Sequence, residues 1–327
     1  MVPQISIALQ TDKPLAAYGS LAASAEAYGF DGVSVYNDML YQPAWLPLLT
    51  IAQNTQRVRI GPAAVNPFTA HPINIAGNLA LVDAVSNGRA YCGFARGAWL
   101  DFLGLEPKKP IATLREAMLC VRHLLRGDKT AFNGDHFRLQ GGDSLRWADV
   151  RPDIPFLLGS WGAKTIRVCS PLVSEIKLGG TANPGAVRWL KARLAEQKTQ
   201  IGIVCGSVTV VDKDGSAARK VARREVALYL PVVAELDPSV HIEPERLRGI
   251  RQAMVEYDVD KAITFISDDL LRKFAFAGTP DDIIAQALSL IEAGCERIEF
   301  GTPHGLDPAH GLALLGEMVL PQIRQNY

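Results

Sequence analysis

The sequence predicts an α/β protein, a (β/α)8 barrel of the TIM type with insertions. Short apolar runs alternate with longer helical stretches along the whole chain. The 28 glycines and 20 prolines stand mostly between these runs, where turns join strands to helices. The apolar runs are nearly continuous, which is typical of strands that are covered on both faces. Eight such repeats favour a barrel over a doubly wound sheet.

The eight strands are expected where short apolar runs are bounded by glycine, proline or polar residues. They are residues 5–10, 32–36, 58–64, 89–95, 155–159, 175–178, 202–211 and 297–300. Longer periodic stretches predict helices at 15–28, 46–54, 73–85 and 111–125, and the first of these ends before Gly29.

One domain of residues 1–327 is expected, because no linker divides the chain. Two insertions interrupt the repeats, at about 132–153 and 228–277. In the first, alternating Phe137 and Leu139 with a turn at Gly141-Gly142 indicate a hairpin. The second is rich in charge and helical pattern and lies between the seventh and eighth strands.

The charge balance argues against two classes of partner. Lys and Arg total 34, as do Asp and Glu, so the formal net charge is zero. This removes the electrostatic attraction that drives most binding to nucleic acids and anionic membranes. The five cysteines include no CxxC pair, and the chain starts without a signal-like apolar segment. A cytoplasmic protein acting on a small molecule is expected.

In a barrel of this kind the chemistry lies after the C-terminal ends of the strands. The sequence contains no GxSxG, HExxH, Walker A or GxGxxG motif, and its six histidines show no metal-ligand spacing, so no metal site is expected. The segment from Gly159 to Thr165 follows a strand and opens a helix, which suits an anion, with Lys164 adding a charge. A tight turn that needs glycine is the alternative. Gly179-Gly180 forms a second backbone-rich loop after the next strand.

Two further loops carry polar and aromatic side chains. Asn66 stands before a proline after the third strand and is therefore held extended. After the fourth strand, Arg96, Trp99 and Asp101 place a guanidinium, an indole and a carboxylate near the mouth. A structural ion pair between Arg96 and Asp101 is the alternative.

Four blocks of the chain resemble one known family. Residues 66–72 (NPFTAHP), 154–164 with 175–180 (EIKLGG), 277–282 (AGTPDD) and 300–308 (FGTPHGLDP) are similar, in order, to blocks of the methylenetetrahydromethanopterin reductases. The chain therefore resembles the luciferase-like flavin and deazaflavin (coenzyme F420) oxidoreductases, and most closely their methylenetetrahydromethanopterin reductase-like branch.

The resemblance implies a luciferase-like TIM barrel with coenzyme F420, or alternatively FMN, in its mouth. It implies a non-prolyl cis peptide at Ala63-Ala64 beneath the cofactor ring, with Asp38 and Asn66 also positioning the ring. The residues implied to hold the cofactor tail are Gly159, Ser160, Gly162, Ala163, Lys164, Gly179 and Gly180.

Two positions depart from the family's deazaflavin members. Those members carry an Asp-His pair after the second strand, whereas Asp38 is followed here by Met39. They place a glutamate proton donor after the fourth strand, where this chain has Ala98. The remaining candidates for proton transfer are Asp38, Asp101 and His304, unless the substrate is an iminium-type acceptor that needs no proton.

The function that the resemblance implies is hydride transfer between the deazaflavin and a small or pterin-like organic substrate. The expected substrate pocket consists of Met39, Trp45, Arg96, Trp99 and Trp161. An FMN-dependent monooxygenase of the same family and a non-catalytic cofactor-binding member are the alternatives. The apolar stretches 46–51 and 73–82 either pack only on the barrel or form the face of a homodimer.

Overall fold

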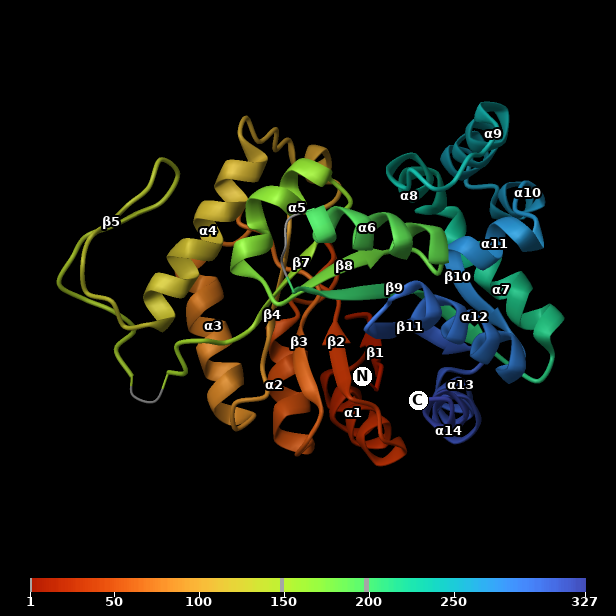
Figure 1. Ribbon diagram of the computed structural model, residues 1–327, viewed down its shortest axis with the longest axis horizontal. Coiled ribbons are helices and arrows are strands. Elements are labelled where there is room, and N and C mark those ends of the chain that lie inside the picture. The colour runs from red at the N-terminus through yellow and green to blue at the C-terminus, as the bar shows by residue number, and fades with distance from the viewer. Residues whose placement is uncertain (1, 148–149, 197–199) are drawn as a thin grey trace. The chain divides into compact units, whose positions relative to one another are not determined.

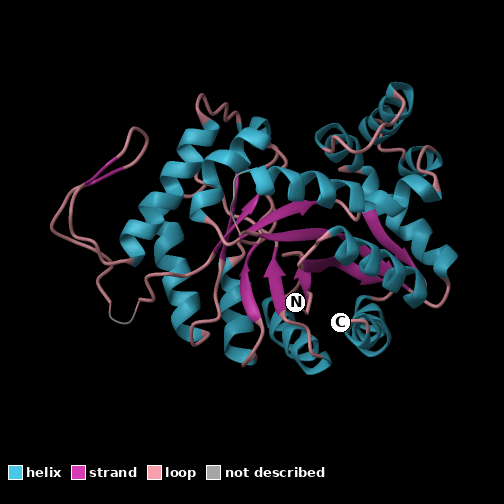
Figure 2. Ribbon diagram, viewed as in Figure 1, coloured by secondary structure: helices cyan, strands magenta, loops and turns pink. Residues whose placement is uncertain are grey.

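The structure is a computed structural model that describes residues 2–147, 150–196 and 200–327. Strands and helices alternate along the chain (Figures 1 and 2). The strands of the repeat are β1 (Gln4–Leu9), β2 (Gly32–Val35), β3 (Arg59–Pro62), β4 (Cys92–Ala95), β7 (Phe156–Gly159), β8 (Glu175–Gly179), β9 (Gly202–Val211) and β11 (Arg297–Gly305). All eight predicted strands are therefore confirmed, in the element order of a (β/α)8 barrel.

Helices follow these strands in sequence. In the first half they are α1 (Leu15–Tyr28), α2 (Trp45–Asn54), α3 (Pro72–Val85), α4 (Pro110–Leu125), α5 (Ala163–Cys169) and α6 (Pro184–Glu196). In the second half they are α7 (Gly215–Ala227), α12 (Pro280–Ala293), α13 (Pro308–Leu314) and α14 (Leu320–Gln325), with a π-helical turn, η3 (Leu315–Val319), before α14. The four predicted helices agree with α1 to α4 to within one residue.

The chain consists of two compact units. The first unit contains Met1–Leu9, Ala27–Asp31 and Lys177–Tyr327, and the second contains Gln10–Glu26 and Gly32–Ile176. In the second unit, β2 pairs in parallel with β3 and β4 pairs in parallel with β7. Two parallel bridges, Ile60 to Ala90 and Val65 to Phe94, join the segments of β3 and β4. The ends of these four strands are thus held together within one unit.

The first unit has a parallel sheet in which β11 lies between β1 and β9. A further strand, β10 (Ala275–Gly278), pairs in parallel with the outer half of β9. The sequence did not predict β10, which falls in the stretch interpreted as an insertion. Fully buried Phe276 and Phe300 meet edge to face, with ring centroids 5.0 Å apart, and help to form the core of this unit.

The segment 228–277 also contains four short helices. They are α8 (Leu230–Leu236), α9 (Pro244–Val255), α10 (Val259–Thr264) and α11 (Asp268–Phe274). α12, which follows β10, starts with a capping box: the Thr279 hydroxyl accepts from the Asp282 amide at 3.3 Å, and the Asp282 carboxylate accepts from the Thr279 amide at 2.9 Å.

The predicted hairpin is present in the second unit, but its turn was misplaced. β5 (Phe132–Asn133) and β6 (Arg138–Leu139) are antiparallel, and the Gly134 amide donates to the Phe137 carbonyl at 3.0 Å. The turn therefore spans 134–137 and not Gly141-Gly142. The hairpin extends beyond α3 and α4 (Figure 1). Residues 148 and 149 of this expected insertion lie outside the described residues.

Candidate functional site

The loop after β3 lies at the centre of the candidate site in the second unit. The peptide bond between Ala63 and Ala64 is cis. Asn66 is 6% exposed, and its side-chain carbonyl accepts from the amides of Phe68 and Thr69 at 3.0 Å each. This Asx turn fixes the direction in which the chain leaves the strand.

The loop after β2 brings Asp38 and Met39 to the same end of the second unit. Asp38 is exposed, and its carboxylate accepts from the Gln10 side-chain amide at 2.8 Å. Met39 and Trp45 are partly exposed. The loop therefore presents one carboxylate whose orientation is set by a neutral hydrogen bond.

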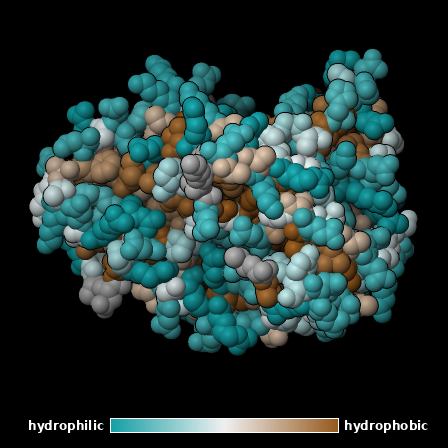
Figure 3. All heavy atoms as spheres, in the orientation of Figure 1, coloured by the Kyte–Doolittle hydropathy of each residue, from teal (hydrophilic) through white to brown (hydrophobic). Residues whose placement is uncertain are grey.

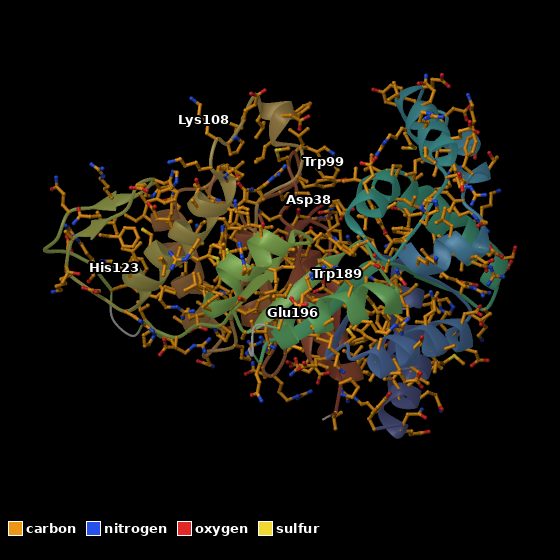
Figure 4. All side chains as sticks on the ribbon, turned by 45° about the horizontal axis from the view of Figure 1, so that its top comes forward. Asp38, Trp99, Lys108, His123, Trp189 and Glu196 are labelled. Atoms are coloured by element: carbon orange, nitrogen blue, oxygen red, sulfur yellow. The ribbon has the colours of Figure 1, made fainter. Side chains whose placement is uncertain are left out.

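The loop after β4 packs against the loop after β3. Gly97 has φ of 88°, and a Cβ on this residue would lie 3.0 Å from the side-chain nitrogen Nδ2 of Asn66. Only glycine satisfies both the backbone angle and this close approach. Trp99 also has a left-handed φ, of 52°, and is 48% exposed. Asp38 and Trp99, on the loops after β2 and β4, are labelled in Figure 4.

Arg96 and Asp101 do not form the structural pair that the sequence left open. Both side chains are exposed, and the structure, which describes both residues, shows no ion pair between them. Ala98 is exposed on the same loop, so this position offers no ionisable group. The Asp101 carboxylate and the Arg96 guanidinium are therefore both accessible to a ligand.

The loop between β7 and α5 supplies the polar backbone expected from the sequence. The Gly162 amide donates to the Ser160 hydroxyl at 3.2 Å, which leaves that amide occupied. Ala163 and Lys164 begin α5, and the first amides of a helix have no acceptor within it. Both residues and Gly162 are exposed, and Gly159 and Trp161 are partly exposed. These backbone donors and the Lys164 ammonium suit an anionic group.

Gly179, Gly180 and His304 belong to the first unit. Gly180 has φ of 75°, and its amide donates to the Gly206 carbonyl at 2.7 Å. The Gly180 amide is therefore not free for a phosphate, and the position of a Cβ on Gly180 is filled by Val233 and Tyr229. His304 is 3% exposed and its Nε2 lies 3.2 Å from the Phe300 carbonyl, so it is a buried residue within β11.

A buried ion pair that the sequence analysis missed lies beneath the Gly179-Gly180 loop. Lys177 on β8 contacts Glu299 on β11, and the two residues are 7% and 0% exposed. The Arg297 guanidinium lies 3.5 Å from the other oxygen of Glu299. A Cβ at Gly206 would lie 3.0 Å from Lys177 Cε, so the pair fills the space beside the residue that accepts from Gly180. The sequence did contain a signal of this pair, because Lys177 and Glu299 are charged residues within otherwise apolar strands. Strands that are covered on both faces rarely contain unpaired charge.

Two kinds of feature are absent from the residues that the structure describes. They contain no group of three or more His, Cys, Asp or Glu side chains that could hold a metal ion. No helix within 2–147, 150–196 and 200–327 is long and apolar enough to cross a membrane.

Comparison with known proteins gives matches that cover most of the chain. The family model described as luciferase-like monooxygenase matches residues 2–297. The chain is 24% identical over 318 residues to a 5,10-methylenetetrahydromethanopterin reductase of Methanolobus tindarius, covering 94% of this chain and 96% of the relative. It is 25% identical over 329 residues to an F420-dependent glucose-6-phosphate dehydrogenase of Nakamurella multipartita, covering 93% and 91%.

A solved structure has the same fold. The coenzyme F420-dependent tetrahydromethanopterin reductase from Methanopyrus kandleri superposes with a TM-score of 0.88 at 23% identity, over 99% of this chain and 100% of that chain. The eight-strand order described above is thus the TIM-barrel fold that this reductase also adopts.

Proposed function

Because the chain belongs to the luciferase-like monooxygenase family, we propose that it is a deazaflavin (coenzyme F420)-dependent reductase. Family members are F420- or flavin-dependent oxidoreductases. In this chain the reaction is hydride transfer between the deazaflavin and a small or pterin-like organic substrate. Two proteins named as F420-dependent, a glucose-6-phosphate dehydrogenase and a tetrahydromethanopterin reductase, differ in substrate, so they support the cofactor more strongly than the substrate.

The observation that carries the proposal is the loop that begins α5. The free amides of Ala163 and Lys164, with the Lys164 ammonium, suit a phosphate of the cofactor tail. Gly159, Ser160 and Gly162 let the tail approach the backbone. In the first unit, the position of a Cβ on Gly179 is open, whereas that of a Cβ on Gly180 is filled by Val233 and Tyr229. The deazaflavin supplies the hydride when it is bound.

Other residues of the second unit orient the ring and the substrate. Asp38, Asn66 and the Ala63-Ala64 bulge position the ring, while Met39, Trp45, Arg96, Trp99 and Trp161 line the substrate side. Asp38 and Asp101 are the carboxylates of this unit that we propose for moving a proton to or from the substrate, because both are exposed on loops at strand ends. His304 is a weaker choice, since it is buried and its Nε2 is close to a carbonyl.

An absorbance titration of the purified protein with deazaflavin and with FMN tests the proposal. Deazaflavin should bind with a dissociation constant at least about tenfold below that of FMN. Replacing Lys164 by Gln should weaken deazaflavin binding by about tenfold, as expected for one charge-assisted hydrogen bond. The same change at Lys220 on α7 is the matched control and should have no effect.

The alternatives give different results in the same assay. Failure of deazaflavin to bind would contradict the proposal. Oxygen consumption with supplied reduced FMN would support the FMN-dependent monooxygenase. Tight cofactor binding without turnover across a substrate panel would support a non-catalytic member, in keeping with Met39 and Ala98.

A further inference from the structure

The loop after β8, residues 179–183, is attached to the segment around α8. Both belong to the first unit. We propose that Asn183 and Asp237 are positioning residues for the cofactor. Their buried hydrogen bond fixes the 179–183 loop, and with it Gly179, the residue of this loop that is open to the cofactor tail. The proposal rests on the proposed function and adds to it two residues that act through the loop and not by contact with the cofactor.

The 179–183 loop has one open side and one covered side. A Cβ on Gly179 would meet no atom within 4 Å. A Cβ on Gly180, in contrast, would lie 2.8 Å from Val233 Cγ2 and 3.0 Å from the ring of Tyr229, the N-cap residue of α8. The loop therefore presents Gly179 to a ligand, while Gly180 packs on α8.

The next polar groups of the loop form hydrogen bonds at the end of α11. The Ala182 amide donates to the Lys273 carbonyl at 2.9 Å, and the Thr181 hydroxyl donates to the same carbonyl at 3.2 Å. The backbone amide of Asn183 donates to the Thr181 hydroxyl at 3.1 Å. These donors are engaged within the protein, so they stabilise the conformation of the loop instead of binding an anion.

The side chain of Asn183 connects the loop to the end of α8. Its Nδ2 donates to Asp237 Oδ2 at 2.9 Å and to the Ser239 hydroxyl at 2.8 Å, and its Oδ1 accepts from the Gly185 amide at 3.0 Å. Asp237 is the C-cap residue of α8, and its Oδ1 accepts from the Ser239 amide and hydroxyl at 2.9 and 2.6 Å. Both N–H groups and the carbonyl of the Asn183 side chain thus have partners.

Burial makes this connection difficult to replace. Polar side chains cover most of the face in Figure 3, whereas Asn183 and Asp237 are only 7% and 2% exposed. A buried polar group that loses its partner keeps the full cost of its desolvation. Moving the loop away from α8 would therefore break bonds that the buried surroundings do not replace. The segment around α8 thus determines where Gly179 lies.

A loop that is fixed in advance favours binding. The cofactor then does not have to order the loop when it binds, and its affinity is higher for that reason. Loss of the bond between Asn183 and Asp237 should therefore weaken binding of the cofactor tail. Binding of the ring, which the proposed function assigns to loops of the second unit, should change little.

Fluorescence titration of full-length variants with two probes tests the proposal. The probes are coenzyme F420 and a deazaflavin that lacks the phosphate-bearing tail. Asn183→Asp places two carboxylates together, and Asp237→Asn leaves one amide group facing a donor of Asn183 or of Ser239. Each variant should raise the dissociation constant of coenzyme F420 by about tenfold, and that of the tail-less deazaflavin by less than about twofold.

The double variant provides the rescue. Asn183→Asp combined with Asp237→Asn restores the pair with donor and acceptor exchanged. It should bring the dissociation constant of coenzyme F420 back to within about threefold of the wild-type value. If a single variant does not fold, Ser239→Ala takes its place. It removes one of the two acceptors of Asn183 and should raise the same dissociation constant by about threefold.

The matched control is Asp258→Asn. Asp258 caps α10 in the same segment through a bond from the Lys261 amide at 2.9 Å, and this change should not alter either dissociation constant. Residues that only stabilise the fold would lower the unfolding temperature without changing the affinity of the folded protein. That result, an equal loss for both probes, or no recovery in the double variant would overturn the proposal. A wild-type protein that binds no coenzyme F420 would instead contradict the proposed function.

Discussion

Glu26 is a buried carboxylate that holds the segment between α2 and β3. It is 8% exposed and accepts hydrogen bonds from the amides of Gln56 and Val58 at 2.9 Å, and from the amide of Arg57. Burial raises the pKa of Glu26, but the hydrogen bonds from Arg57, Val58 and Gln56 outweigh it and hold the pKa below its usual value. The ionised form is therefore the one that stabilises the fold.

Replacing Glu26 by Gln should lower the free energy of unfolding at neutral pH by about 1 to 3 kcal/mol, because one amide donor would then face backbone donors. Since the folded-state pKa is depressed, the stabilisation is complete above the unfolded value of about 4.3 and is lost as the pH falls through the folded-state pKa. Urea unfolding at neutral pH and below pH ~4 measures this. A difference between wild type and variant that stays constant on acidification would contradict the assignment.

The pair of Lys177 and Glu299 gives a second prediction. Lys177→Met should destabilise the protein by about 3 kcal/mol, because Glu299 would remain buried with Arg297 as its charged neighbour. Adding Glu299→Gln also takes this carboxylate away from the buried Arg297 guanidinium and should therefore destabilise the protein further. Thermal and urea unfolding of the two variants measure this, and a double variant more stable than Lys177→Met would contradict the assignment of Glu299 as the partner of Arg297.

The sequence predicted which loops form the candidate site, but not which backbone amides in these loops are already hydrogen-bonded within the protein. Gly162 and Gly180 were expected to offer amides, and the structure engages both within the protein. A sequence pattern identifies a glycine loop, whereas the acceptor for each amide depends on tertiary contacts. For Gly180 that acceptor is Gly206, which is 26 residues away in the chain.

The β5–β6 hairpin shows how a distant element decides the position of a turn. Glu116 on α4 accepts from the amides of Asp135, His136 and Phe137 at 3.0, 2.7 and 2.6 Å. A Cβ at Gly134 would lie 2.0 Å from the Glu116 carboxylate, so glycine is needed at that position. Gly141-Gly142 resembles a turn in sequence, but no local signal reveals that a carboxylate on α4 organises residues 134–137. β10 was not predicted for a related reason. Its four residues form a strand only because they pair with β9, which lies far away in the sequence.

Glu116→Gln should loosen the hairpin without unfolding the protein. Losing the carboxylate weakens three amide hydrogen bonds, so local opening of residues 134–139 should become at least about tenfold more frequent. Hydrogen–deuterium exchange measures this by segment, and trypsin cleavage after Arg138 gives a second readout. Glu317→Gln, at an exposed site in η3, is the control. Unchanged exchange in the hairpin would show that Glu116 does not hold it.

For the molecule as a whole, the eight repeats were predictable because each strand and its helix give a local signal. Periodicity placed all eight strands and the first four helices. Long-range pairing is less visible in sequence, and the division into two units depends on contacts between residues far apart in the chain. Whether two copies of the chain associate depends likewise on the outer surface. Local periodicity does not show whether an exposed face binds a second copy.

The outer face of α2 and α3 supports the expected homodimer. Both helices belong to the second unit and pack on each other, and apolar residues occur on their outer sides as well as toward the core. Leu46, Ile73 and Leu81 are 59%, 46% and 49% exposed. A helix that is apolar all round is usually buried all round. We therefore propose that this face meets its copy across a two-fold axis.

Leu81→Glu should then convert the dimer into a monomer. A two-fold interface contains each substituted residue twice, so one change places two like charges in an apolar contact. Losing about 3 kcal/mol or more corresponds to at least about a hundredfold weaker association. Light scattering after size-exclusion chromatography measures the mass, and Val255→Glu, on exposed α9, is the control that should remain dimeric. A wild-type chain that is monomeric at high concentration would contradict the dimer. A Leu81→Glu variant that stays dimeric would show that the interface lies elsewhere.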